Sequence, residues 1–526
     1  MTDPATPTRS EAIGGADGLR LSTARGRWVL TATVLGSSIA ALDATVVGIA
    51  QPAIGKEFHA PIAGLQWISV GYLLSLAGLL LLTGAMSDRF GRRRVFLIGV
   101  AWFAVASLVC AIAPSINLLI AARVLQGVGG ALLTPGSLAI LEASFVPAER
   151  GRVIGAWSGL GGVATAIGPP LGGFLITALS WRLIFLINAP IALAVIFISL
   201  RHVPESRDPD ATGAIDVAGS ALTVTALVGI SYGLIEGTAT GWTSVLVRSA
   251  LVVGAAALVL FIVVELRVRA PIVPLTIFRS AQFSATNVVT LLIYAVLGGM
   301  MFLLPIELQQ VSRYSPTAAG ASFLPLTFLM LVLSSRSGAL AARIGPRLQM
   351  SVGPLVVAGG LAMLARIDSG GNYLLEVLPA VLVFGLGLAA TVAPLTMTAL
   401  SSAPPEKTGL ASAVNNTVAR SGSLLAVALL PAVAGIAGDS YLHPAVFESG
   451  FQRAAIIAAV ICAAGGLLAA ATIRNPRRPL TVIQPRLAGE FHCAVDATPL
   501  RRGLHDGERR SGLAGEVPVG VSDRPS

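Results

Sequence analysis

The sequence predicts an all-α polytopic membrane protein with 14 transmembrane helices, arranged as two pseudo-symmetric six-helix bundles plus a central extra helix pair. Three observations predict this fold class: a low content of charge, apolar segments that recur at the length of a bilayer crossing, and an internal repeat. Of the 526 residues, 54% are hydrophobic and 12% are charged, whereas soluble domains have about 25% charged residues. A soluble protein of this composition would lack the polar groups to cover its surface.

Fourteen apolar segments follow one another along the chain, each near the roughly 20 residues that a helix needs to cross hydrocarbon. They lie at about 28–50, 67–86, 95–113, 118–140, 152–178, 183–200, 214–235, 245–266, 283–306, 317–335, 349–366, 374–399, 409–436 and 452–473. The connections between them are short, so we expect no soluble domain between the spans.

An internal repeat divides these spans into two sets. The loop Gly84–Arg94 matches Gly338–Leu348 at an offset of 254 residues, and Gln126–Ala131 matches Phe384–Ala389 at an offset of 258. Related halves that enclose a site near the midplane are typical of transporters. The expected domains are a cytoplasmic tail (1–27), an N-terminal six-helix half (28–200), a linker with two extra transmembrane helices (201–282), a C-terminal six-helix half (283–473) and a cytoplasmic, disordered tail (474–526).

The net charge of +10 has a topological explanation. With the N-terminus inside, the inward loops carry fifteen Lys and Arg residues and the outward loops six, as the positive-inside rule requires. The even number of spans then puts both termini in the cytoplasm, with the protein in the cell membrane. The frequent use of Arg over Lys, with abundant Ala and Gly, is typical of a GC-rich bacterial genome. Because the basic residues lie in loops and tails, they do not indicate a nucleic-acid partner.

Several other classes of protein are excluded by what the sequence lacks. The three cysteines form no disulfide framework or metal set, and neither lysine lies in a phosphate-binding loop. All five histidines fall in loops or in the C-terminal tail, which leaves no histidine proton relay or zinc site in the spans. We therefore expect no enzyme activity, no metal and no cofactor.

Four motifs point to a more specific function. One is the loop Gly84–Arg94, whose candidate residues are Gly84, Asp88, Arg89, Gly91, Arg92 and Arg93. Another, in the fifth span, consists of Gly155, Gly168, Pro169, Gly172 and Gly173. The remaining two contain Arg123, followed by Gln126 and three glycines, and Asp43, within Leu42–Pro52. A charged side chain inside a span costs a few kcal/mol on insertion scales and is a functional-site hypothesis by default.

Together the four motifs resemble those of the major facilitator superfamily, and within it the 14-span drug:proton antiporters, over about residues 28–475. The resemblance implies that Gly84–Arg94 is a conformational gate in which Asp88 pairs with a basic residue or a helix N-terminus. It implies that Arg123 acts in proton transfer beside a carboxylate, and that Asp43 faces a cavity and takes up and releases protons. It also implies that the glycine–proline motif marks an exporter.

Each of these motifs also has a plainer interpretation. The loop could serve topology alone, Arg123 could extend from a span end to the interface, Asp43 could be structural, and the glycines could serve general helix packing. Arg420, Asn415 and Asn416 in the thirteenth span indicate either cavity lining or core packing. Glu307, near a span end, is a candidate for the coupling site or a solvated rim residue.

The leading expectation is a proton-coupled exporter that moves amphipathic small molecules, often cationic, such as drugs or antibiotics, by alternating access. Its partners would be the lipid bilayer, protons and the transported molecule, with a functional monomer and no cofactor. The alternatives are a dedicated exporter of one endogenous secondary metabolite, or a superfamily importer or uniporter.

Overall fold

The computed structural model describes residues 18–208, 216–268, 271, 273–367, 372–404 and 407–475, which are almost entirely helical. The only β-pairing among these residues is an isolated bridge between Leu19 and Phe145. Most of the two predicted tails, 1–17 and 476–526, lies outside the described residues. The described residues up to Asn475 belong to one compact unit.

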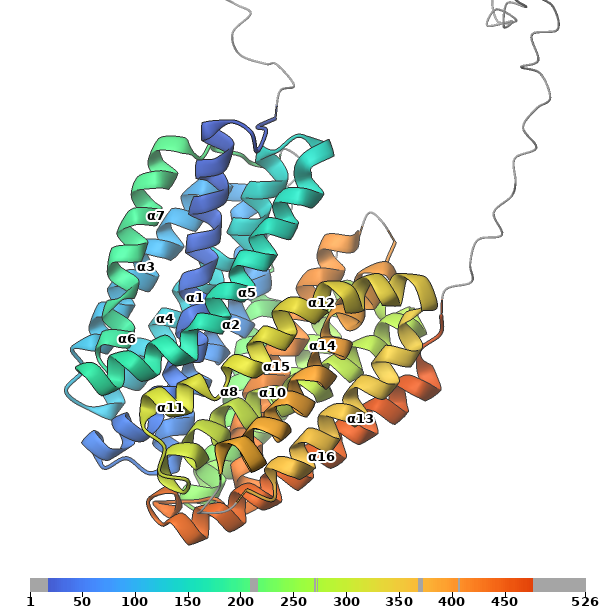
Figure 1. The fold of residues 1–526 in the computed structure, drawn as a ribbon. Coiled ribbons are helices and arrows are strands. Elements are labelled where there is room, and N and C mark those ends of the chain that lie inside the picture. Colours follow the sequence, from blue (N-terminus) through green and yellow to red (C-terminus); the bar gives the residue numbers. More distant parts are fainter. Residues whose placement is uncertain are drawn as a thin grey trace, which may run out of the picture. The chain divides into compact units, whose positions relative to one another are not determined.

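The described residues contain 14 helices that are long and apolar enough to cross a membrane, as the sequence predicts. Figure 1 shows how these helices are arranged. The helices are α1 (Ala24–Phe58), α2 (Ile62–Phe90), α3 (Arg92–Ala111), α4 (Ile116–Ser144), α5 (Pro147–Ala178), α6 (Leu183–Leu186), α7 (Asn188–His202), α8 (Val217–Ala239), α9 (Val245–Arg267), η1 (Leu275–Arg279), α10 (Ala281–Gln310), α11 (Pro316–Ala321), α12 (Leu324–Ile344), α13 (Pro346–Leu364), η2 (Tyr373–Val377), α14 (Leu378–Ser401), α15 (Thr408–Ala434), η4 (Ser440–Leu442) and α16 (Pro444–Thr472).

Several helices extend beyond the apolar segments predicted from the sequence. Side-chain caps and backbone conformation, rather than apolar content, determine where these helices begin and end. The hydroxyls of Thr23, Ser115 and Ser315 accept hydrogen bonds from backbone N–H groups in the first turns of α1, α4 and α11. Three predicted spans are each built from two elements, namely α6 with α7, α11 with α12, and η2 with α14. The first span is also longer than predicted, since α1 continues through Pro52 to Phe58.

The two repeated loops have the same backbone conformation. Gly91 joins α2 to α3 with φ of 111°, and Gly345 joins α12 to α13 with φ of 89°. Both values lie in a region that only glycine adopts without strain. The repeat that the sequence predicts therefore extends to the backbone of these two loops.

The same two loops are also tied to their own halves in the same way. The backbone N–H of Arg93 donates to Oε1 of Glu205, just after α7, at 3.0 Å. The backbone N–H of Arg347 donates to Oδ1 of Asn475, just after α16, at 3.0 Å. Each loop thus binds the segment that follows the last helix of its half, which fixes the two six-span bundles internally.

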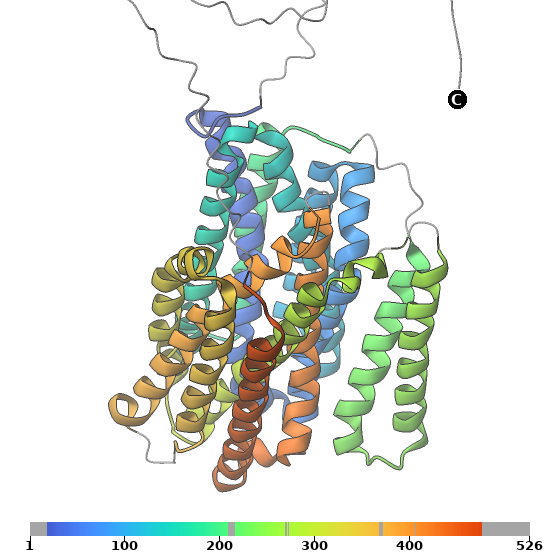
Figure 2. The same ribbon diagram turned by 90° about the vertical axis from the view of Figure 1, so that its right-hand side faces the viewer.

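The extra pair consists of α8, which packs on α2 and α15, one helix from each half, and α9, which packs on α8 (Figure 2). The indole Nε1 of Trp67 in α2 donates to Oε1 of Glu236 in α8 at 2.9 Å. Most of α9 is exposed, as a lipid-facing apolar helix would be. The pair therefore lies at a seam between the halves.

The halves meet closely at one end of the bundle. The terminal end of the bundle is the end where α1 begins and where Gly91 and Gly345 lie. The end where the halves meet is called the opposite end, and it contains His59, Arg313 and Gly438. Hydrogen bonds between the halves gather at the opposite end: Gln66 to Val427 O at 2.7 Å, Tyr441 to Ala60 O at 2.7 Å, Ile62 N to Gly438 O at 2.9 Å, Gln309 to Ile49 O at 3.0 Å, and Thr317 to Gly173 O at 3.1 Å.

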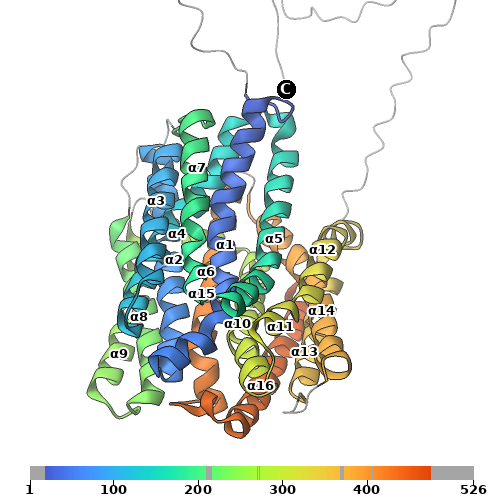
Figure 3. The ribbon, with the colours of Figure 1, turned by 60° about the vertical axis from the view of Figure 1, so that its left-hand side comes forward.

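At the terminal end the halves diverge along α5 (Figure 3). Gly155 and Gly173 are 18 residues apart, which is five helical turns, so they share one face of α5. A Cβ at Gly173 would collide with the backbone of Pro316, whereas a Cβ at Gly155 would meet no atom within 4 Å. The same holds at Gly151 and Gly159. One face of α5 thus packs on the C-terminal half at the opposite end and is open at the terminal end.

Candidate functional site

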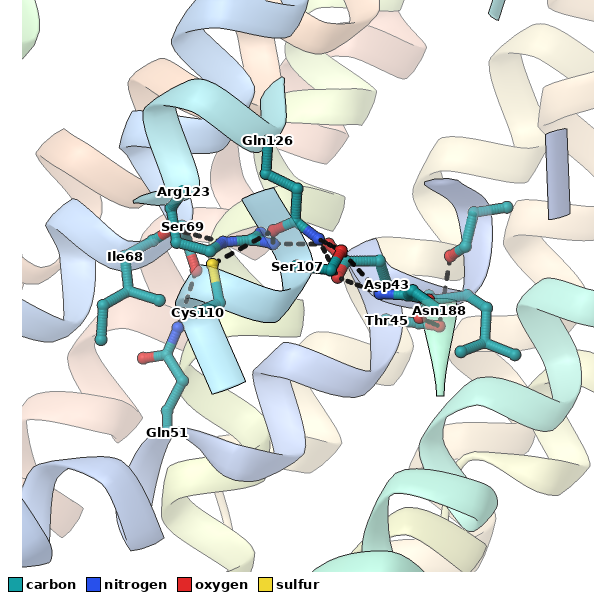
Figure 4. Close-up of polar contacts among 12 residues, drawn as sticks. Asp43, Thr45, Gln51, Ile68, Ser69, Ser107, Cys110, Arg123, Gln126 and Asn188 are labelled. Atoms are coloured by element: carbon teal, nitrogen blue, oxygen red, sulfur yellow. Dashed lines mark hydrogen bonds and ion pairs between the residues drawn. The ribbon is translucent and has the colours of Figure 1, made fainter. Parts of the chain in front are cut away.

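The centre of the N-terminal half contains an ion pair between two of the predicted site residues. Arg123 in α4 and Asp43 in α1 are each 1% exposed, and Nη1 of Arg123 lies 2.5 Å from Oδ2 of Asp43 (Figure 4). Within a low-dielectric interior, each charge is tolerated because the other is adjacent. The carboxylate beside Arg123 that the resemblance implied is therefore Asp43.

Three further side chains complete a polar network around this pair. Gln126 donates from Nε2 to Oδ1 of Asp43 at 2.9 Å and to the hydroxyl of Ser107 at 2.7 Å. Asn188 donates to the same two oxygens at 3.3 Å. The network links α1, α3, α4 and the start of α7, and it holds the carboxylate in one orientation.

Arg123 is fixed on its other sides as well. Its Nε donates to the backbone O of Ile68 at 3.2 Å, where α2 passes, and its Nη1 also bonds the side-chain O of Gln126 at 2.5 Å. The guanidinium lies 4.3 Å from the ring centroid of Tyr72 and 5.7 Å from that of Phe185. An arginine that extends to the membrane interface would be exposed, so that alternative is wrong.

A cavity of about 220 Å³ lies between the halves, next to this pair. The N-terminal half contributes residues of α1, α2, α4 and α5, and the C-terminal half contributes residues of α10 and α15 together with Phe323, which precedes α12. Its lining includes Arg123 and Tyr72; Asp43 is not among the lining residues but is bonded to Arg123. Asp43 is thus paired with a residue of the cavity wall, and its access to the cavity stays a prediction.

The three candidates in α15 have different surroundings. Asn415 is buried and donates to Asn287 Oδ1 at 3.2 Å and to Thr290 Oγ1 at 2.9 Å, both in α10. Asn416 is exposed, and Arg420 is half-buried on the face of α15 that carries two of the cavity's lining residues. Asn415 therefore connects α15 to α10 within the C-terminal half. Asn416 is turned toward open space, and Arg420 toward the cavity side.

Glu307 is entirely buried near the opposite end of α10. It is 0% exposed, and neither of its carboxyl oxygens has a hydrogen-bond partner. A solvated rim position, which the sequence also allowed, is therefore wrong. Glu307 does not line the cavity, although Pro305, two residues before it, does.

The loop motif is bound within its own half. Asp88 forms an ion pair with Arg92 at 2.8 Å, in the first turn of α3, and its backbone O accepts from the N–H of Asp208 at 3.1 Å. Nη1 of Arg93 donates to the backbone O of Val203 at 3.0 Å. The guanidinium of Arg89 lies 5.7 Å from the ring of Phe90. Asp88 thus has a basic partner, which comes from its own half.

The glycine–proline motif in α5 contacts both halves. A Cβ at Gly168 or Gly172 would collide with Thr45 or Val46 of α1. A Cβ at Gly173 would collide with Pro316 of α11, and one at Gly320 would collide with the backbone of Pro169. The end of α5 near Pro169 therefore closes the opposite end by direct backbone contact.

Gly84, in the loop motif, has a looser environment. A Cβ built at Gly84 would meet only Pro135, at 4.0 Å.

Sequence reasoning missed two members of the network, Ser107 and Asn188, and gave Gln126 no role at the site. Asn188 carried a usable signal, because it is a strongly polar residue within a predicted span. Ser107 carried none, since serine is common in spans and bonds its own helix backbone. Across the described ranges, no group of three or more His, Cys, Asp or Glu residues could hold a metal ion.

Known proteins with similar sequences and folds agree with this architecture. The family model of the Major Facilitator Superfamily matches residues 33–427. The chain is 37% identical over 428 residues to the tetracenomycin C resistance and export protein of Streptomyces glaucescens, covering 81% of this chain and 79% of that protein. It is 36% identical over 445 residues to the puromycin resistance protein pur8 of Streptomyces alboniger, covering 83% and 86%.

Among solved structures, a bacterial homolog of the human lysosomal transporter Spinster, in an inward-facing and unoccupied conformation, has a similar fold. Its TM-score is 0.60 at 16% identity, and the alignment covers 87% of this chain and 100% of that one. This likeness concerns the fold alone. The family model and the relatives above 30% identity each span most of the chain, and so the chain belongs to the Major Facilitator Superfamily, as its motifs predict.

Proposed function

We propose that this protein is a proton-coupled exporter that moves amphipathic small molecules, such as drugs or antibiotics, out of the cell by alternating access. The observation that supports it most strongly is the buried pair of Asp43 and Arg123 next to a cavity between two repeated halves. Relatives named for antibiotic resistance and export support the direction and the class of substrate. The protein would act in the cell membrane as a monomer without a cofactor.

The excess of Lys and Arg in the loops at the terminal end supports a cytoplasmic position for that end. With this orientation, the structure corresponds to an inward-open state, since α5 faces open space at the terminal end and the halves contact each other at the opposite end. A substrate would enter the cavity from the cytoplasm or the inner leaflet. Rocking of the halves would then break the contacts of Gly173 and Gly320 and open the site outward.

The pair of Asp43 and Arg123 would couple this motion to the proton. Protonation of Asp43 removes the negative charge that holds Arg123, and the guanidinium is then free to lean into the cavity that it lines. A positive charge exposed there would change the affinity of the cavity for a charged substrate and alter the contacts to α2 through Ile68. Loss of the proton to the cytoplasm would restore the ion pair.

The loop motif would act as the gate that resemblance predicts. Asp88 pairs with Arg92 in the inward-open state, and we propose that closure at the cytoplasmic side brings the C-terminal half against this loop. The second copy of the motif has Ala342 in place of the acid. The gate would therefore work from the N-terminal half.

A dedicated exporter of one endogenous metabolite is the second candidate. Two of the relatives, from Streptomyces, are named for the export or transport of a single compound, tetracenomycin C and actinorhodin. A dedicated exporter and a multidrug exporter would share the fold and the coupling site, and they would differ in the range of compounds moved.

The test uses everted membrane vesicles that contain the protein, with an imposed proton gradient that acidifies the lumen. We expect a fluorescent amphipathic dye to accumulate in these vesicles, and an uncoupler to release it. Vesicles without the protein provide the control. Dye accumulation that persists after the gradient is collapsed, or that equals the control, would overturn the proposal.

A further inference from the structure

A second arginine, Arg420, lies beside the cavity, and it stands apart from the ion pair. Ser423 and Val427 of α15 line the cavity. Arg420 precedes them by three and seven residues, so all three lie on one face of the helix. Arg420 is thus about one helical turn closer to the terminal end than the cavity wall. That position is on the path by which a molecule would reach the cavity from the open side.

Arg420 differs from Arg123 in having no acid beside it. No Asp or Glu of the described residues lies within 4 Å of its guanidinium, and its buried Nε has no hydrogen-bond acceptor. An arginine keeps its proton even in apolar surroundings, so its positive charge stays uncompensated in this conformation.

The net charge at the cavity is therefore positive. The charge of Arg123 is balanced by Asp43, 2.5 Å away. That of Arg420 is not balanced by any described acid at salt-bridge distance. A bare cation beside an apolar cavity repels cationic molecules and attracts an anionic oxygen.

An independent observation at the same place points to the same ligand chemistry. Tyr72 lines the cavity and is 1% exposed, yet its hydroxyl has no hydrogen-bond partner. A buried hydroxyl without a partner costs free energy unless a ligand or water satisfies it. Tyr72 on the cavity wall and Arg420, about one helical turn from it, together offer two unmet donors, an O–H and an N–H.

We propose that Arg420 and Tyr72 form an acidic-oxygen subsite, and that the preferred substrates are amphipathic molecules bearing a phenolate, enolate or carboxylate on an apolar body. This inference rests on the proposed export function and changes the expected substrate from cationic to anionic. Arg420 supplies a charge-assisted hydrogen bond to the ionised oxygen, and Tyr72 donates a neutral one. The apolar lining, including Met301, Phe302 and Leu297, packs on the body of the molecule.

The test compares two dyes with the same xanthene body and opposite charge, fluorescein as the anion and rhodamine 123 as the cation. In everted vesicles with a lumen-acid gradient, we expect the wild type to move fluorescein in preference to rhodamine 123 after subtraction of protein-free vesicles. Arg420→Gln should lower fluorescein transport by about tenfold and leave rhodamine 123 transport unchanged or higher, because one charge-assisted contact is lost. Arg420→Lys should keep most of the preference, and Arg248→Gln, at an exposed arginine far from the cavity, should change neither dye.

A binding measurement on purified wild-type protein keeps the inference testable if the variants fold poorly. Fluorescence anisotropy should show tighter binding of fluorescein than of rhodamine 123, with the difference reduced by high salt. Tighter binding of rhodamine 123, or fluorescein transport unaffected by Arg420→Gln in a well-folded variant, would overturn the subsite. Preferred fluorescein binding without gradient-driven movement of either dye would support the subsite and contradict the proposed export function.

Discussion

At the scale of single residues, the site is organised by the cost of charge in an apolar interior. Asp43 and Arg123 were identifiable from the sequence because each places a charge within an apolar span. Their mutual contact was not identifiable, because 80 positions separate them and only the packing of α1 on α4 brings them together. The role of Asn188 was also missed, since neutral polar residues cost less in spans and give a weaker signal.

The geometry around Arg123 predicts that a lysine cannot replace it. The guanidinium contacts Asp43, Gln126 and Ile68 O at once, and its flat face lies over Tyr72. A lysine ammonium is a point charge without this fork. We expect Arg123→Lys to lower gradient-driven dye transport by about tenfold or more, measured in vesicles against equal amounts of protein.

A matched control is Arg182→Lys. Arg182 also pairs with an acid, Glu57 at 2.7 Å, but it is partly exposed at the opposite end. Exposed pairs contribute about 0–1 kcal/mol, so we expect little change in transport. Full activity of Arg123→Lys would contradict the role given to the guanidinium.

At the scale of helices, α5 explains why one glycine-rich segment contains two kinds of glycine. Those near Pro169 allow backbone contact between α5 and its neighbours, whereas Gly151, Gly155 and Gly159 meet nothing within 4 Å. The sequence predicted a motif of small residues but gave no means of separating these two sets. The distinction depends on the tilt between the halves, which no local pattern encodes.

The close contact at Pro169 and the free space at Gly159 predict opposite outcomes for a glycine-to-valine substitution. Gly320→Val would place its side chain against the backbone of Pro169 and prevent the closed contact at the opposite end. We expect it to shift the protein away from the inward-open state and to reduce transport strongly. Gly159→Val, at a position with free space, should retain transport within about twofold, since surface changes away from packed contacts have small effects.

The measurement is dye transport together with the distance between spin labels on α5 and α12 at the opposite end. An increase in that distance in Gly320→Val, and none in Gly159→Val, is the predicted result. Equal behaviour of the two variants would show that the close backbone contact has no part in the motion.

At the scale of the whole molecule, span count, repeat and family could be read from the sequence, because bilayer thickness and the positive-inside rule act on every segment alike. The correspondence of Arg93 with Arg347 also followed from the repeat, and the structure shows the same backbone contact at both. The conformational state did not follow from the sequence. A transporter must adopt both states with one sequence, so the pattern of residues cannot select between them.

The orientation and the open side can be tested together by thiol labelling. In a background without Cys110, Cys462 and Cys493, we expect Gly155→Cys to react with a membrane-impermeant thiol reagent in everted vesicles and not in right-side-out ones. Thr243→Cys, in the loop between α8 and α9 at the opposite end, should show the reverse. Labelling of both from the same side would contradict the orientation, and a silent Gly155→Cys would contradict the open cytoplasmic side.

In the proposed mechanism, protonation of Asp43, through its pairing with Arg123, couples the proton gradient to transport. The most direct measurement compares wild type and Asp43→Asn in reconstituted vesicles, in gradient-driven accumulation and in dye exchange without a gradient. We predict that Asp43→Asn lowers gradient-driven accumulation by about tenfold or more and retains exchange, because the cavity remains while the titrating group is lost. Gradient-driven accumulation equal to that of the wild type would contradict the coupling role of Asp43.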